Sequence, residues 1–349
     1  MIFDHADFDG HEQVVFCHDP SVGLKAIIAI HSTALGPAAG GCRMHPYASE
    51  AEALTDVLRL SKGMTYKNAV AGLPLGGGKC VIIGDPNDKQ KPEVLRAFAH
   101  HVQSLQGRYW TAIDVGVGPK DADVLAEQCD YIFARASQYE VGFNPSAFTA
   151  YGGFIGIKAA VNTVLARSDL QRLKVAVQGL GATGYALCQH LSTHGATLMV
   201  SDIDDAAVTK VINDFGAEAY APDRIHTVNA DVFAPCAMGA GLNDQTIPEI
   251  KAKIVCGLAN NQLAEDRHGQ ALMEAGIAYV PDFVVNAGGM MGASTVIFSN
   301  PSRAASIQRI EGLYDIITTI LERSQNESRP SSIIADDMAL TRIHEEGRN

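Results

Sequence analysis

The segment Lys174-Val175-Ala176-Val177-Gln178-Gly179-Leu180-Gly181-Ala182-Thr183-Gly184 decides the fold of the second half of the chain. An apolar run typical of a buried strand leads directly into a G-x-G-x-x-G turn, and helical spacing continues to His194. The next strand-like run, 197–201, ends at Asp202. This order of strand, glycine turn, helix, strand and acidic residue is typical of a dinucleotide-binding βαβ unit.

The glycines and Asp202 predict how a dinucleotide would bind. Gly179 allows a tight turn, Gly181 lets a pyrophosphate approach the backbone, and Gly184 lets the helix pack closely on the strand. The unpaired N–H groups at the start of the helix favour phosphate. Asp202 can bind ribose hydroxyls and would repel a 2′-phosphate, and Ile203, Asp204 and Asp205 add no cation, so NAD is favoured over NADP. A structural turn without a ligand is the alternative.

Strand-like and helical segments alternate along the whole chain, which predicts an α/β fold with two domains. The first domain is expected at residues 1–140 and the second, a Rossmann-type domain with a parallel sheet, at 141–327. The tail at 328–349 is expected to pack back on the first domain. Within the first domain, strand-like runs stand at 13–18, 24–33, 80–83 and 109–113, helical segments at 49–69 and 92–105, and a Gly-rich loop at 76–78.

The composition is typical of a folded, acidic protein. Of 349 residues, 47% are hydrophobic, and 27 Lys and Arg against 39 Asp and Glu give a net charge of −12, which argues against nucleic acid and anionic membranes as partners. No signal peptide or membrane span is predicted, and seven cysteines without a C-x-x-C pair suit a reducing cytoplasm. The histidines at 100–101, 190 and 194 lack the spacing of further ligands, so no metal site is predicted.

Two lysines and one aspartate are the candidates for chemistry in the first domain. Lys79 follows three glycines in an apolar stretch, which disfavours the ammonium form and suits a general base. Lys67 stands at the end of a capped helix, and charge repulsion would add to this effect if it lay near Lys79. Asp114 ends a strand-like run, where a site carboxylate is expected; a helix N-cap is the alternative. The small-residue segment 36–41 is either a turn or a surface for a small substrate.

Motifs along nearly the whole chain resemble the superfamily of glutamate, leucine, phenylalanine and valine dehydrogenases, and the leucine dehydrogenases most. They lie at 35–41, 62–68, 76–79, 114–116, 144–146, 149–152, 234–237, 260–263 and 281–289. The resemblance implies an enzyme that reversibly deaminates an L-amino acid with NAD⁺, giving a 2-oxo acid, ammonium and NADH. It also implies an N-terminal substrate and oligomerisation domain, a Rossmann-type NAD-binding domain and an active site in the cleft between them.

The resemblance further implies a role for each matching residue. Lys67 would bind the substrate α-carboxylate, Lys79 would activate the attacking water as general base, and Asp114 would exchange protons with the amine. Further substrate contacts are implied at Gly40, Gly41, Met64 and Asn261. Cofactor contacts are implied at Ser146, Thr149, the 179–184 turn, Asp202, Ile203, Cys236, Ala237, Ala259, Asn260 and Asn261.

The residues implied to line the substrate pocket favour an apolar side chain. Members that act on glutamate carry a lysine where Ala39 stands, and Ala293 lines the same pocket, so a substrate carboxylate would be left unpaired. Ala112 fits the leucine-type pattern, whereas Met290 is larger than the residue expected there. Leucine, isoleucine and valine are therefore the expected substrates.

Two other functions stay open on the same scaffold. One is a dehydrogenase of an aromatic amino acid, phenylalanine or tryptophan. The other is a catalytically impaired NAD-binding sensor, which the presence of Lys67, Lys79 and Asp114 disfavours. Since such relatives are homo-oligomers, an octamer is expected, with a dimer or tetramer as alternatives.

Overall fold

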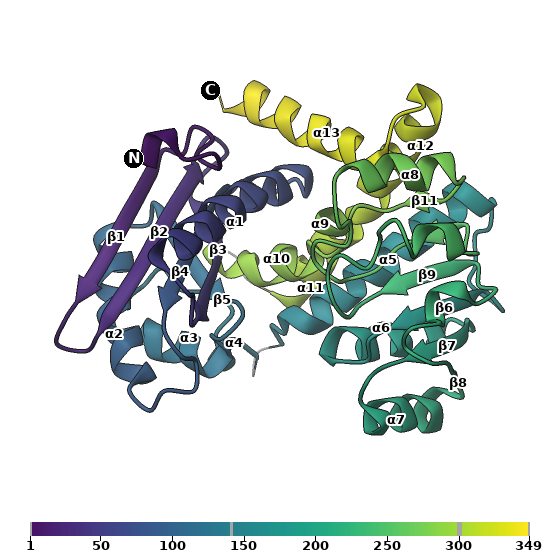
Figure 1. Cartoon of the computed structure of the whole chain (residues 1–349), viewed down its shortest axis with the longest axis horizontal. Coiled ribbons are helices and arrows are strands. Elements are labelled where there is room, and N and C mark those ends of the chain that lie inside the picture. Colours follow the sequence, from purple (N-terminus) through teal and green to yellow (C-terminus); the bar gives the residue numbers. More distant parts are fainter. Residues whose placement is uncertain (1, 140–141, 299–301, 348–349) are drawn as a thin grey trace. The chain divides into compact units, whose positions relative to one another are not determined.

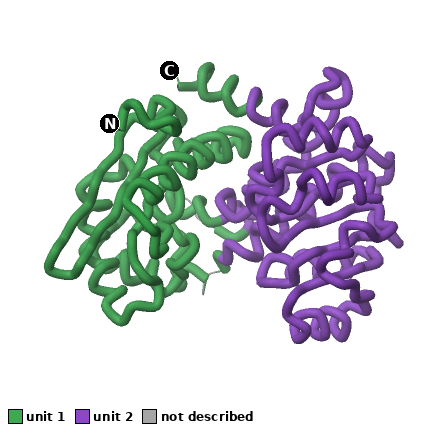
Figure 2. The backbone as a smooth tube through the Cα atoms, in the orientation of Figure 1, with its two compact units in different colours: residues 1–143, 293–303, 338–349 green, residues 144–292, 304–337 purple. Residues whose placement is uncertain are grey.

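The computed structural model describes residues 2–139, 142–298 and 302–347 and divides into two compact units, coloured separately in Figure 2. The first unit holds Met1–Phe143, Ala293–Arg303 and Met338–Asn349, and the second holds Asn144–Gly292 and Ala304–Asp337. The predicted boundary after residue 140 falls outside the described residues. Of the tail at 328–349, the part from Met338 belongs to the first unit.

The first unit is built on a mixed five-stranded sheet in the order β1-β2-β4-β3-β5 (Figure 1). β2 runs antiparallel to both its neighbours, and β3 runs parallel to β4 and β5. The strands are β1 (Gln13–Asp19), β2 (Leu24–Ser32), β3 (Ala38–His45), β4 (Gly76–Ile83) and β5 (Tyr109–Ile113). The helices are α1 (Glu50–Val70), α2 (Lys91–Ser104), α3 (Pro119–Ala126) and α4 (Ala136–Tyr139).

Two glycine-rich segments of this sheet differ from what the sequence predicts. The Gly-rich loop predicted at 76–78 is wrong, because β4 begins at Gly76 and pairs with β2 and β3. The segment 36–41 is not only a turn, since β3 begins at Ala38 and lies between β4 and β5. Glycine weakens a strand, but at these positions the lack of a side chain lets neighbouring segments lie closer to the backbone of the strand.

The alternation of side chains along β3 and β4 divides the unit into two cores. Cys42, Met44, Cys80 and Ile82 belong to one large buried cluster, whereas Val81 packs with residues of α1. Because successive strand residues point to opposite faces, residue 79 shares the face that α1 covers. This parity decides which polar side chains share a face with α1.

The chain end also belongs to the first unit. Within α13 (Ser331–Glu346), Nη1 of Arg342 donates to the carbonyl oxygens of Ala69 at 2.9 Å and Leu73 at 3.0 Å. Ala69 lies in the last turn of α1, where helix carbonyls lack intrahelical partners, and Leu73 lies in the segment that follows the helix. The contact therefore holds the last turns of α13 against the end of α1.

The second unit contains a six-stranded sheet in the order β11-β10-β9-β6-β7-β8, with all pairs parallel. The strands are β6 (Lys174–Gln178), β7 (Thr197–Ser201), β8 (Glu218–Ala219), β9 (Val232–Pro235), β10 (Ile254–Val255) and β11 (Ala278–Tyr279). The helices are α5 (Pro145–Leu165), α6 (Ala182–Thr193), α7 (Asp205–Phe215), α8 (Arg267–Glu274), α9 (Asp282–Val285), α10 (Gly288–Ala293), α11 (Arg303–Glu311) and α12 (Leu313–Glu327). Strand order reverses between β6 and β9, where such sheets bind ligands.

Candidate active site

The polar centre of the first unit is an ion pair between Lys79 and Asp114. Nζ of Lys79 lies 2.7 Å from Oδ2 of Asp114, and the lysine side chain is only 8% exposed. Lys79 follows the three glycines of β4, and Asp114 follows the last residue of β5. The N-cap of α3 is Gly118, so the alternative of Asp114 as a helix cap does not hold. The structure thus brings together two of the candidate residues for chemistry.

Arg43 supplies a second cation to Asp114, and no pattern in the sequence singles this residue out. Its Nε donates to Oδ2 of Asp114 at 3.2 Å, while Nη1 donates to Asp56 on α1 at 2.9 Å. Burial alone would raise the pKa of Asp114, but the charges of Lys79 and Arg43 hold this pKa below its ordinary value. Asp114 is therefore an ionised carboxylate with two cationic partners.

Glycines bring the backbone of β3 against its neighbours beside this ion pair. A Cβ added to Gly40 would lie 1.9 Å from the carbonyl oxygen of Gly78 and 3.1 Å from Cγ of Met64. One added to Gly41 would lie 2.9 Å from Cβ of Asp114. Neither position accepts a side chain, so Met64 lies against Gly40 and Asp114 lies against Gly41.

Lys67 reaches this region on the last turns of α1. The next residue, Asn68, is fully buried and donates from Nδ2 to the carbonyl oxygens of Gly76 at 2.6 Å and Ala39 at 3.4 Å. These bonds fix the end of α1 over β3 and β4. The helix therefore holds Met64 against Gly40, and Lys67 follows in the last turn of the same helix.

The predicted pocket alanines add no charge to this face. Ala39 is fully buried and pairs with Gly77 and Trp110, and Ala112 is 5% exposed and pairs with Gly41. By strand parity, both point to the same face as Lys79. Met290 and Ala293 stand three residues apart on α10, Met290 partly exposed and Ala293 buried.

The glycine turn of the second unit has the geometry that the sequence predicts. Gly179 adopts φ +95°, a conformation that favours glycine, and a Cβ on Gly184 would lie 1.9 Å from the carbonyl oxygen of Gly179. A Cβ on Gly181, the N-cap of α6, would meet nothing within 4 Å. The carboxylate of Asp202 accepts the backbone N–H of Leu180 at 2.5 Å. Of these three glycines, only Gly181 therefore has open space at the position that a Cβ would take.

A cavity of about 230 Å³ lies beside this turn. Gly179, Asp202, Ile203, Ala237 and Met238 are among its lining residues, and the two large apolar side chains are mostly solvent-exposed. A Cβ on Gly179 would lie 2.7 Å from Cβ of Ala237, so the loops after β6 and β9 touch at the reversal of strand order. Exposed apolar side chains beside a carboxylate and a helix N-terminus fit a dinucleotide.

The other predicted cofactor residues lie on neighbouring loops of the same unit. Cys236 follows β9, and its N–H donates to Gln178 at 2.7 Å. Asn261 has φ +51°, and its carbonyl oxygen accepts the N–H of Ala240 at 2.7 Å, which ties the loop after β10 to the loop after β9. Ala259 and Asn260 lie on the same loop after β10, and Ser146 and Thr149 lie in the first turns of α5.

Comparison with known proteins places both units in one family. The profile described as Glu/Leu/Phe/Val dehydrogenase, dimerisation domain, matches residues 11–131, and that described as Glutamate/Leucine/Phenylalanine/Valine dehydrogenase matches residues 199–330. The chain belongs to the Glu/Leu/Phe/Val dehydrogenase family. This confirms the resemblance found in the sequence and the two-domain α/β fold.

Members of the dehydrogenase family align with nearly the entire chain. It is similar to leucine dehydrogenase of Bacillus cereus, with 46% identity over 342 residues, 98% of this chain and 93% of that protein. It is 43% identical to phenylalanine dehydrogenase of Caldalkalibacillus thermarum over 343 residues, 97% and 92% of the two chains. The crystal structure of L-tryptophan dehydrogenase from Nostoc punctiforme superposes with a TM-score of 0.86 at 41% identity, covering 97% of this chain and 98% of that one.

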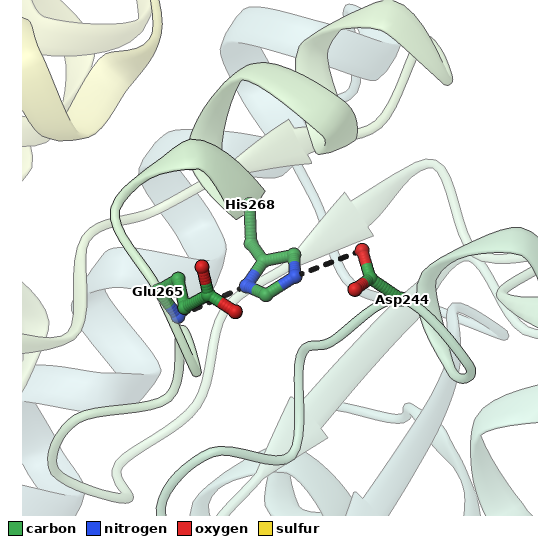
Figure 3. Close-up of side chains that lie close together, drawn as sticks. All are labelled: Asp244, Glu265 and His268. Atoms are coloured by element: carbon green, nitrogen blue, oxygen red, sulfur yellow. Dashed lines mark hydrogen bonds and ion pairs between the residues drawn. The ribbon is translucent and has the colours of Figure 1, made fainter.

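A separate polar cluster of this dehydrogenase, Asp244, Glu265 and His268, is shown in Figure 3. Nδ1 of His268 accepts the N–H of Glu265 at 2.9 Å, which leaves Nε2 as the donor to Asp244 at 3.2 Å. Arg267 pairs with both carboxylates, and its hydrogen bonds lower the pKa of Asp244 to about 2. Both ring nitrogens of His268 and every carboxylate oxygen of the cluster thus already take part in hydrogen bonds.

Within the described parts of the chain, none of the helices has the length and the apolar character needed to span a membrane.

Proposed function

We propose that this protein catalyses the reversible, NAD-dependent oxidative deamination of an apolar L-amino acid, with leucine, isoleucine and valine preferred. The observation that carries the proposal is the buried pair of Lys79 and Asp114 on a sheet face whose nearby Ala39 and Ala112 are uncharged. Such a pair can accept and donate protons, and the alanines would lie against an apolar side chain. The similarity to leucine dehydrogenases supports the same substrate class.

In this proposal, the first unit binds the amino acid and moves its protons. Lys67 binds the α-carboxylate, and the backbone at Gly40 and Gly41 contacts the substrate. Asp114 accepts a proton from the substrate amine, and Lys79 takes the proton of the water that attacks the imino carbon. When bound, NAD⁺ supplies the hydride acceptor for the α-carbon.

The second unit would hold NAD rather than NADP. The helix N-terminus at Gly181 binds the pyrophosphate, and Asp202 binds the adenosine ribose while repelling a 2′-phosphate. The open space at Gly181 and the cavity beside Asp202 support this assignment. The remaining contacts are proposed at Ser146, Thr149, Gly179, Leu180, Ala182, Thr183, Gly184, Ile203, Cys236, Ala237, Ala259, Asn260 and Asn261.

The side-chain pocket we propose is lined by Ala39, Met64, Ala112, Met290 and Ala293, all of them uncharged. A glutamate carboxylate would find no cation among them. An aromatic substrate is the second candidate, because small alanines leave room for a ring and because the protein resembles a tryptophan dehydrogenase over nearly its full length. Discrimination by one methylene is worth only about 1–3 kcal/mol, so the order of substrates must be measured.

We also propose a homo-oligomer, an octamer before a tetramer or dimer, which acts in the cytoplasm. The match of residues 11–131 to a dimerisation-domain profile supports assembly through the first unit. All seven cysteines are free, which suits a reducing compartment.

The test is a panel of initial rates of NADH formation at mildly alkaline pH. Purified protein is given L-Leu, L-Ile, L-Val, L-Phe, L-Trp, L-Met and L-Glu, first with NAD⁺ and then with NADP⁺. Turnover of branched-chain substrates with NAD⁺, abolished by Lys79→Ala, supports the proposal, whereas preference for L-Phe or L-Trp selects the aromatic candidate. Tight NADH binding without turnover of any amino acid would replace both with an NAD-binding sensor.

A further inference from the structure

Arg43 stands between the ion pair of Lys79 and Asp114 and a second acidic residue on α1. It comes from β3, two residues beyond Gly41, on the face that α1 covers. Nε contacts Oδ2 of Asp114 at 3.2 Å, and Nη1 contacts Oδ1 and Oδ2 of Asp56 at 3.2 and 2.9 Å. Arg43 and Asp114 are only 25% and 20% exposed. One guanidinium therefore bridges two carboxylates from different elements.

Asp56 is itself held in place, so Arg43 has little freedom to turn. The hydroxyl of Tyr47 donates to Oδ2 of Asp56 at 2.5 Å. Burial and the Asp56 carboxylate raise the pKa of Tyr47, which keeps this hydroxyl protonated as a donor. The planar guanidinium then fits one carboxylate with Nη1 and the other with Nε, an arrangement that a lysine ammonium cannot reproduce.

The balance of charges around Asp114 affects how Lys79 can lose its proton during the reaction. Two cations, Lys79 and Arg43, face two anions, Asp114 and Asp56. If Lys79 were the only cation beside Asp114, the loss of its proton would leave a buried carboxylate without a counterion, which is costly. A guanidinium does not lose its proton in proteins, so Arg43 remains as a counterion through the whole proton cycle.

We propose that Arg43 is a positioning residue that holds Asp114 ionised and oriented while Lys79 exchanges its proton, with Asp56 and Tyr47 as its anchor. This inference rests on the proposed function and deepens it. Among the described residues, the cations that lower the pKa of Asp114 are Lys79 from β4 and Arg43 from β3, and the neighbouring carboxylate on α1 is Asp56, which Arg43 also binds. Of these two cations, Arg43 is the permanent one.

The test compares Arg43→Met and Arg43→Lys with Arg59→Met as the matched control. Arg59 lines the same cavity of about 570 Å³ as Arg43, but it is mostly exposed and pairs with Asp7. Arg43→Met should lower kcat by ~10-fold to 100-fold with a smaller change in KM. It should also move the acid limb of the kcat/KM–pH profile upward by about one unit or more, because Asp114 loses one of two cations.

The variants distinguish the effect of the positive charge of Arg43 from the effect of its attachment to Asp56. Arg43→Lys should restore part of the shift in the acid limb but not kcat, since a point charge cannot grip both carboxylates. Asp56→Asn keeps the charge of Arg43 and loosens its anchor, so it should lower kcat without moving the acid limb upward. Arg59→Met should match the wild type in both. An acid limb that stays in place in Arg43→Met, or moves equally in Arg59→Met, overturns the proposal.

A second readout does not depend on turnover. Urea unfolding of the wild type, Arg43→Met, Asp114→Asn and the double variant gives the coupling between the two residues. The coupling should be present at pH 7 and weaken as the pH falls through the lowered pKa of Asp114, because the protonated carboxyl no longer pairs with Arg43. If the wild type turns over no amino acid but the coupling is found, the proposed function fails and the ionic link stands. If turnover occurs without coupling, the role of Arg43 fails alone.

Discussion

Alanine substitutions in the glycine turn at 179–184, the proposed cofactor turn, distinguish a glycine needed for ligand binding from a glycine needed for packing. In Gly181→Ala, the new methyl group meets no protein atom within 4 Å, and the backbone angles of φ −63° and ψ −169° suit alanine. Alanine restricts the unfolded chain but is a poorer N-cap than glycine, so the free energy of unfolding should change by less than about 1 kcal/mol. The methyl group would stand where we place the pyrophosphate. NADH should therefore bind ~10-fold to 100-fold more weakly, a loss of about 1.4–2.8 kcal/mol.

Gly184→Ala should give the opposite result. Its Cβ would lie 1.9 Å from the carbonyl oxygen of Gly179 and 3.0 Å from the carbonyl carbon, and both are backbone atoms that cannot rotate away. Helix α6 must then shift by about 1 Å against β6, which should cost about 2–3 kcal/mol of stability. Its effect on NADH binding should follow from this loss of structure.

Urea unfolding and titration of NADH fluorescence measure the two quantities separately. Gly63→Ala in α1 is the control, because its Cβ also meets nothing within 4 Å and it lies far along the chain from the cofactor turn. It should stabilise the helix by about 0.5–1 kcal/mol and leave NADH affinity unchanged. Wild-type NADH affinity in Gly181→Ala would refute the placement of the pyrophosphate, and wild-type stability in Gly184→Ala would refute the packing argument.

Three further changes have defined outcomes. Asp202→Asn should raise the ratio of NADP⁺ to NAD⁺ turnover, measured by initial rates, because the repulsion of a 2′-phosphate is lost. Ala39→Lys should reduce leucine turnover at least ~10-fold and raise the relative rate with L-Glu, since it places a cation at the fully buried pocket position. Burial lowers the pKa of His31 to about 4, below its ordinary 6.5. The free energy of unfolding, measured by urea titration, should therefore have its full value above pH 6.5 and fall by about 3 kcal/mol toward pH 4. In His31→Phe this decrease should be smaller.

The glycine turn of the second unit and the elements around it could be predicted because their signals are local in the sequence. The strand at 174–178, the glycine turn and the helix from Ala182 are consecutive, and each has its own periodicity or turn chemistry. Asp202 ends the very next strand, where it meets the turn through the N–H of Leu180. This turn required no knowledge of strand order, whereas the contacts proposed on the loops after β9 and β10 were implied only by the family resemblance.

The ion pair in the first unit depends on strand order instead. Lys79 and Asp114 meet because β3 lies between β4 and β5, although β3 comes first along the chain. Spacing in the sequence does not contain this order, so only the family resemblance pointed to their proximity. Arg43 was missed for the same reason, since an arginine two residues after Gly41 looks like a surface residue until β3 is known to be a central strand.

The glycines before Lys79 explain why the surroundings of the Lys79–Asp114 ion pair were harder to predict than the glycine turn at 179–184. Local propensity disfavours a strand at 76–78, but at each position a neighbouring residue occupies the space that a side chain would need. A Cβ on Gly76 would clash with Ser32, one on Gly77 with Thr65, and one on Gly78 with the ring of Tyr109. Neighbouring elements thus occupy the space of the missing side chains, and tertiary packing overrides propensity. The same absence of side chains lets α1 come close to the sheet just before the lysine. A sequence rule that treats three glycines as a loop therefore fails where the backbone itself forms the floor of a site.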